Sequence, residues 1–180
     1  MLDAMETIAP YAARGVKIVG LEPSCIMTFR DELPALFPRL SAVQMVAANT
    51  MLIDEFLARE ARAGRMSLAL RPASAPILLH GHCHQKAFGA VNAILEVLRL
   101  IPGSQPRLID SSCCGMAGSF GYEAEHHEMS MRMAELKLFP ALRAAPEAIV
   151  VADGTSCRHQ IRDGLGREAL HAARLLERLL

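Results

Sequence analysis

The chain has no tryptophan, and aromatic residues of all kinds make up only 4% of its 180 residues. Proteins that bind single-stranded nucleic acid stack bases on aromatic side chains, so this composition argues against that class. Neither sign of charge is in excess, because 19 Lys and Arg residues face 19 Asp and Glu residues. A chain without net charge is a poor general binder of nucleic acid or acidic membranes. We therefore expect no nucleic-acid partner.

The sequence also lacks a long apolar run. The best candidate, residues 43–53, contains Gln44 and Asn49 and is shorter than the roughly 20 apolar residues of a membrane helix. No basic leader is present, and Asp3 and Glu6 lie where a signal peptide would be apolar. We expect a cytoplasmic protein that does not span a membrane and that reaches the inner membrane, if at all, as a peripheral protein through its partners.

Hydrophobic residues make up 52% of the chain, which is enough to form a core. Short apolar runs typical of strands lie at residues 16–21, 77–80, 107–110 and 148–152. Helical patterns cover residues 2–14, 24–37, 42–63, 84–100, 123–138 and 168–180. Short apolar strands that alternate with helices predict an α/β fold, with Rossmann-like layers in which a mostly parallel sheet is flanked by helices.

Residues 16–33 resemble residues 148–165. Each segment has an apolar strand, then Ser-Cys, then Arg-Asp, then leucine, all in the same register. In the second copy, strands that end near Cys83 and Cys113 precede this segment, and the first copy has no counterpart to them. We therefore expect a tandem-repeat domain whose first copy is truncated and lacks its N-terminal half. The predicted units are the C-terminal half of a first repeat (1–66), a linker (67–76) and a complete second repeat (77–180).

Every cysteine follows the C-terminal end of a predicted strand. They are Cys25, Cys83, the adjacent pair Cys113 and Cys114, and Cys157. In an open parallel sheet the carboxyl ends of the strands share one edge, and ligands bind there. The last four cysteines would then supply the four thiolates of an iron–sulfur cluster or of a structural zinc site. Ordinary buried cysteines are the plainer interpretation, because cysteine is among the most buried residue types.

The spacing favours a cluster over a single ion, because the sequence contains no Cys-x-x-Cys. Adjacent cysteines do not easily reach one small ion from an unstrained backbone, but they reach different irons of a cluster if the chain bends. Gly115, Gly118 and Gly121 allow that bend. The same glycine-rich turn would donate backbone N–H groups to cluster sulfides.

Histidines surround Cys83 in the segment HGHCHQ, which contains His80, His82 and His84. Imidazole is a common metal ligand, but we favour a hydrogen bond from one of these rings to a cluster sulfur or to the backbone. The candidates for supporting or ligating roles are Cys25, His82, His84, Gly115 and His159.

The Cys-Cys-Gly sequence at 113–115, with Cys83 upstream and Cys157 downstream, resembles the cysteine-rich CCG domain. That domain occurs as a tandem pair in one of the subunits of heterodisulfide reductase and in the iron–sulfur subunits of glycolate oxidase and anaerobic glycerol-3-phosphate dehydrogenase. The stretches GLEPSC, LLHGHCHQKAFGA, SSCCGMAGSFGYE and VADGTSCRHQI are most similar to the C-terminal region of FAD-linked oxidases of the D-lactate dehydrogenase type.

The resemblance implies a [4Fe–4S] cluster on Cys83, Cys113, Cys114 and Cys157. Such a cluster would relay electrons from a flavin that oxidises a 2-hydroxy acid to a quinone or protein acceptor. The FAD would lie on another domain or subunit. The last element of the domain is often Cys-x-x-Cys, whereas here residues 157–160 read Cys-Arg-His-Gln. A four-thiolate cluster and a site completed by a histidine therefore both remain open, and the partners of Cys25 would lie in the missing half-repeat.

The sequence contains no G-x-S-x-G and no Ser-His-Asp arrangement with local support. We therefore predict no catalytic residue for an organic substrate, so that the chain is part of an FAD-linked oxidoreductase and not an enzyme alone. Two other functions are considered. One is a structural zinc module for subunit docking, and the other is a thiol–disulfide reductase that uses the adjacent pair Cys113 and Cys114.

Overall fold

A computed structural model describes residues 2–180, apart from the side chain of Leu2. Met1, the first residue of the predicted first repeat, lies outside the described residues. The strands are β1 (Ile18–Gly20), β2 (Thr50–Leu52), β3 (Ile77–Leu79), β4 (Arg107–Leu108) and β5 (Ile149–Val151). The helices are α1 (Leu2–Ala13), α2 (Pro23–Met27), α3 (Glu32–Leu36), α4 (Ser41–Asn49), α5 (Ile53–Arg62), α6 (Cys83–Ala87), α7 (Val91–Leu98), the 3₁₀ turn η1 (Phe120–Tyr122), α8 (His127–Glu135), α9 (Leu138–Arg143), α10 (Thr155–Leu165) and α11 (Ala172–Leu179).

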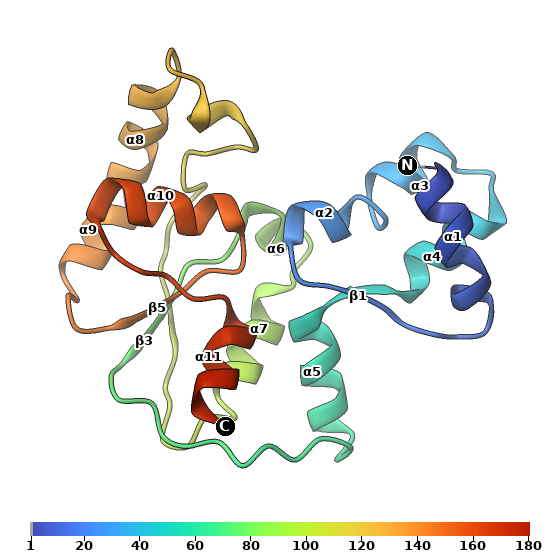
Figure 1. The fold of residues 1–180 in the computed structure, drawn as a ribbon, viewed down its shortest axis with the longest axis horizontal. Helices are drawn as coiled ribbons and strands as arrows, with labels where there is room; N and C mark the ends of the chain where they lie inside the picture. The colour runs from blue at the N-terminus through green and yellow to red at the C-terminus, as the bar shows by residue number, and fades with distance from the viewer. Residues whose placement is uncertain (1) are drawn as a thin grey trace.

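The strands form two small parallel sheets (Figure 1). In the first, β1 pairs with β2 so that Val19 lies opposite Met51. In the second, β3 is central, with β4 on one side and β5 on the other. A single bridge between Val151 and Leu170 extends this sheet beyond β5. The predicted α/β class with parallel strands and flanking helices is confirmed, and the strands are divided between two sheets.

The prediction of one continuous helix over residues 42–63 is wrong in its middle. Helix α4 ends at Asn49, the chain then runs as strand β2, and α5 begins at Ile53. Thr50 is a β-branched residue, which suits an extended strand, and its hydroxyl donates to the Val46 carbonyl at 2.8 Å. Pairing with β1 therefore overrides the helical pattern of the sequence.

Two further predicted helices are divided. The pattern over 84–100 splits into α6 and α7 at Gly89, where φ is +68°. The pattern over 24–37 splits into α2 and α3. Helix α10 has no counterpart among the predicted helices, although Cys157, Gln160 and Ile161 are buried at helical spacing on one of its faces.

The second sheet is covered on both faces, and its central strand β3 is fully buried. Ile77 and Leu79 pack into one apolar cluster with α7 and α11, whereas Leu78 packs into another with α9 and α10. This alternation follows from the period of two in a strand. Figure 1 shows α7 and α11 on one side of β3 and β5, and α9 and α10 on the other.

The N-terminal part of the chain has its own small core, in which Met5, Leu33 and Val43 are buried between α1, α3 and α4. It is joined to the second sheet by α5, because Ala58 lies in the same apolar cluster as Leu79. None of the described helices is both long and apolar enough to cross a membrane.

Asp54 at the start of α5 is 1% exposed, and neither of its carboxyl oxygens has a conventional donor among the described residues. It faces Asp153, which follows β5 and accepts hydrogen bonds from Gln85 Nε2 at 2.7 Å and from the Ala172 N–H at 2.9 Å. Burial, and then the negative charge of Asp153, raise the pKa of Asp54 well above its ordinary value. These causes favour the protonated, uncharged form of Asp54 beside the Asp153 carboxylate.

This pair predicts how stability depends on pH. A carboxyl whose pKa is raised on folding binds more protons in the native state, so the free energy of unfolding falls as pH rises above the unfolded value of about 4. Asp54→Asn keeps a donor toward Asp153 and removes that fall. Urea unfolding should show the variant more stable than the wild type at pH 8 by about 1 kcal/mol or more, with a smaller difference at pH 5.

The matched variant is Asp153→Asn, which loses an acceptor for the buried amide donors of Gln85 and Ala172 and should be less stable at both pH values. A pH-independent difference between Asp54→Asn and the wild type would contradict the assignment of the proton to Asp54.

Candidate metal centre

The structure brings four of the cysteines to one cavity of about 290 Å³. Cys83 opens α6 directly after β3, and Cys157 lies in the first turn of α10 after β5. Cys113 and Cys114 lie in the loop after β4. The three strands are parallel, so their carboxyl ends share one edge and the loops that follow them meet there. The cavity is far larger than the roughly 30 Å³ that one water occupies.

The four thiols form a row in which protons are shared. Hydrogen bonds from the thiols of Cys114 and Cys83 lower the pKa of Cys113. The Cys114 thiol likewise lowers the pKa of Cys157. The same contacts raise the pKa of Cys83 and that of Cys114. The four thiols thus lie close enough to share protons, and a bound cation would replace protons among them. This donor set fits a metal group held by thiolates.

The four thiols differ in their exposure to solvent. Cys114 and Cys157 are each 2% exposed. Cys113 is half-buried, and Cys83 is exposed. A metal group held by all four would have a buried side and a side near the surface.

Lys86 on α6 fastens the loop that carries the adjacent cysteines. Its ammonium donates to the Ser111 carbonyl and, at 2.8 Å, to the Ser112 carbonyl. Burial lowers the pKa of Lys86, and the neighbouring thiolates oppose that shift. The side chain thus holds the backbone that leads into Cys113 and places positive charge beside the thiolates.

Gln160 holds Cys114 from the other side. Its buried amide nitrogen lies 3.0 Å from the Cys114 carbonyl, 3.0 Å from the Ser130 carbonyl and 2.9 Å from the Ser130 hydroxyl. This is the position where a Cys-x-x-Cys sequence would place its second cysteine. Gln160 is directed at the backbone and positions Cys114.

The structure also places the predicted supporting residues. Gly115 donates its N–H to Cys113 Sγ at 3.3 Å. His82 caps α6, because its Nδ1 accepts from the His84 N–H at 3.2 Å, and burial lowers its pKa. His84 lines the cavity. His159 contacts the Tyr122 hydroxyl at 2.5 Å and is not among the residues that line the cavity. Cys25 is exposed and does not line the cavity.

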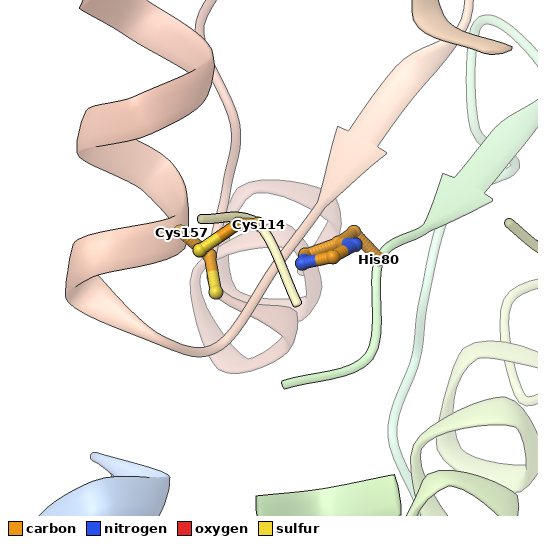
Figure 2. Close-up of side chains that lie close together, drawn as sticks. All are labelled: His80, Cys114 and Cys157. Carbon is orange, nitrogen blue, oxygen red and sulfur yellow. The ribbon is translucent and has the colours of Figure 1, made fainter. Parts of the chain in front are cut away.

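His80 is not among the residues that the sequence predicts to support or bind a metal. The His80 side chain is fully buried at the end of β3. One ring nitrogen of His80 and the sulfurs of Cys114 and Cys157 all lie within 4.8 Å of one another. Figure 2 shows the ring extending toward the two sulfurs. The signal in the sequence was its place as the last residue of a buried strand, beside the other strand ends.

The N-terminal part of the chain covers one side of the site. Ser24 lines the cavity, and the Glu22 carboxylate accepts from the Thr155 N–H at 2.9 Å and from its hydroxyl at 2.8 Å. Burial raises the pKa of Glu22, but these hydrogen bonds from Thr155 lower it further, so that the pKa lies below its ordinary value. The His171 ring also contacts the Leu21 carbonyl at 2.9 Å. These contacts fasten the residues after β1 to the start of α10, which carries Cys157, and to the residue that precedes α11.

The turn at Gly115 predicts a specific loss of stability. Its φ is +104°, and a Cβ there would collide with the Ser130 carbonyl. Gly118 also has a positive φ, +71°, but a Cβ there would meet open space. Gly118→Ala should cost about 1–2 kcal/mol for the left-handed backbone alone. Gly115→Ala should cost about 1–3 kcal/mol more for the collision. Equal losses in urea unfolding would contradict the tight turn.

Comparison with known proteins shows distant homology to parts of dehydrogenases. Over 167 residues, 93% of the chain, the sequence is 28% identical to one of the subunits of anaerobic glycerol-3-phosphate dehydrogenase of Escherichia coli strain K12 and covers 41% of that subunit. Over 166 residues, 92% of the chain, it is 26% identical to D-2-hydroxyglutarate dehydrogenase of the same strain and covers 16% of it. The corresponding protein of Pseudomonas putida is 27% identical over 158 residues, 87% of the chain, which covers 14% of it.

The chain therefore spans less than half the length of these curated relatives. No family model matches the chain. No solved structure matches it either.

Proposed function

We propose that this chain is an iron–sulfur electron-transfer module, as a fragment or subunit of a flavin-linked 2-hydroxy-acid dehydrogenase or oxidase. The observation that carries the proposal is the convergence of four thiols, from the loops after three parallel strands, on one cavity. The similarity to a dehydrogenase subunit and to D-2-hydroxyglutarate dehydrogenase supports an oxidoreductase context.

Cys83, Cys113, Cys114 and Cys157 would hold a [4Fe–4S] cluster, which supplies one-electron transfer when bound. Cys114 is buried while its neighbour Cys113 is half-buried, so the adjacent side chains face different surroundings. That divergence suits a polynuclear group better than one ion. The exposed Cys83 places one side of the site near the surface, where electrons would enter or leave.

Residues of the chain would stabilise the negative charge of such a centre. Cys157 lies in the first turn of the 11-residue helix α10, where the helix dipole favours an anion. The Gly115 N–H points at Cys113 Sγ, and the Lys86 ammonium lies beside the loop of the adjacent cysteines. These groups would raise the reduction potential of the site, because each one stabilises added negative charge.

Oxidation of the organic substrate belongs to another part of this proposed assembly. The FAD would lie on a separate domain or subunit, and the electron acceptor would be a quinone or a protein. The tandem repeat is part of the proposal, with residues 1–66 and 77–180 as its truncated and complete copies. It is supported by the matched starts of α2 at Pro23 and α10 at Thr155, each soon after a parallel strand.

Two alternatives have an observation of their own. The close grouping of His80, Cys114 and Cys157 favours a zinc site in a docking module. The lowered pKa of Cys113, caused first by the hydrogen bond from the adjacent Cys114, favours a thiol–disulfide reductase that uses this pair. In that last case Cys113→Ser would abolish turnover of a disulfide substrate by the metal-free protein.

Metal analysis tests the proposal. Protein purified without oxygen should contain about four irons and four acid-labile sulfides per chain, the content of one [4Fe–4S] cluster. Zinc at about one per chain without sulfide would overturn the cluster and leave the docking module.

A pair of variants tests the ligand set. Cys157→Ser removes a buried thiol from the cavity and should lose most of the iron and sulfide, because a hydroxyl is a poor ligand for this metal group. Cys25→Ser is the matched control, since Cys25 is exposed and outside the cavity, and should keep the wild-type content. Equal iron in both variants would contradict the assignment.

A further inference from the structure

His80 carries a buried nitrogen without a partner. Its side chain is fully buried, and Nε2 has no hydrogen-bond partner among residues 2–180. A buried polar group left unpaired costs about 1–3 kcal/mol. The backbone of His80 gives no reason for a histidine here. Its N–H donates to the Val151 carbonyl at 2.8 Å and extends the β3–β5 pairing, which any residue except proline would do. A bound metal would give this buried nitrogen the partner that it lacks.

The other ring nitrogen is held in place. Nδ1 lies 2.8 Å from the Ser111 hydroxyl, which comes two residues before Cys113. If Ser111 accepts the proton of Nδ1, the lone pair lies on Nε2, which is the form that binds metals. Histidine ligands in proteins commonly donate their second N–H in this way. Lys86 fixes Ser111 in turn through its carbonyl.

We propose that His80 binds the metal directly through Nε2, together with the two buried cysteines Cys114 and Cys157. Its nearest partners are Cys114 and Cys157, the two buried cysteines, so these three form the buried side of the site (Figure 2). The inference rests on the metal site of the proposed function and not on the kind of metal, and a neutral imidazole adds no negative charge to the site.

Zinc alone is the probe, added to metal-free protein without oxygen. X-ray absorption of the zinc-loaded wild type should show sulfur at about 2.3 Å and nitrogen at about 2.0–2.1 Å. His80→Leu, which is similar in volume, should lose the nitrogen contribution. His127→Leu is the control and should keep it, because His127 is exposed and does not line the cavity. A shell of sulfur alone in the wild type, or nitrogen that persists in His80→Leu, would overturn the proposal.

A second variant keeps His80 in place, in case His80→Leu does not fold. Ser111→Ala removes the partner of Nδ1 and should weaken zinc binding about 10–100-fold, as loss of such a partner does elsewhere. Ser119→Ala is the control, because Ser119 is exposed and does not line the cavity. Equal zinc affinity in the two serine variants would count against a metal-bound His80.

The two proposals fail separately. Iron and sulfide content decides whether the native group is a cluster. If the protein takes up iron and sulfide while zinc-loaded His80→Leu keeps its nitrogen shell, only the role of His80 is wrong. If zinc binds through His80 and the protein takes up neither iron nor sulfide, only the cluster is wrong.

Discussion

The parallel pairing of β3 with both β4 and β5 is the constraint on which the site depends. Parallel strands end at the same edge of a sheet, so cysteines far apart in the sequence emerge side by side. Residues 77–79 of β3 are buried on both faces, and a one-residue shift in register would move Ile77 and Leu79 out of the apolar cluster that they share with α7 and α11. The apolar core thus sets which loops, and so which thiols, meet at this edge of the sheet.

Polar side chains fix the loops that follow the strands by hydrogen bonds to their backbone. Asp153 binds Gln85 and the start of α11, Lys86 binds the carbonyls before Cys113, and Gln160 binds the carbonyl of Cys114. Asp153 and Gln160 satisfy backbone or amide groups that would otherwise be buried unpaired, and Lys86 ties down a loop that is partly exposed. The loops around the four thiols therefore have defined positions without regular secondary structure, and the site and the fold are coupled.

The sequence predicts the structure well where short apolar runs mark the strands. It located β1, β3, β4 and β5 and the cysteines that follow them. It failed at residues 42–63, because a helical pattern hides the pairing of β2 with β1, and at α10, whose polar residues obscure its buried face. It also undervalued His80, since the unpaired nitrogen is visible only once Ser111 and the buried cysteines are placed around it.

We propose that the thiols after β3, β4 and β5 form one centre that accepts an electron. Electron paramagnetic resonance of protein purified without oxygen, recorded before and after reduction with dithionite, is the decisive measurement. We expect an iron–sulfur signal that appears on reduction and is absent from Cys157→Ser. A protein that is silent in both states and contains zinc would contradict it.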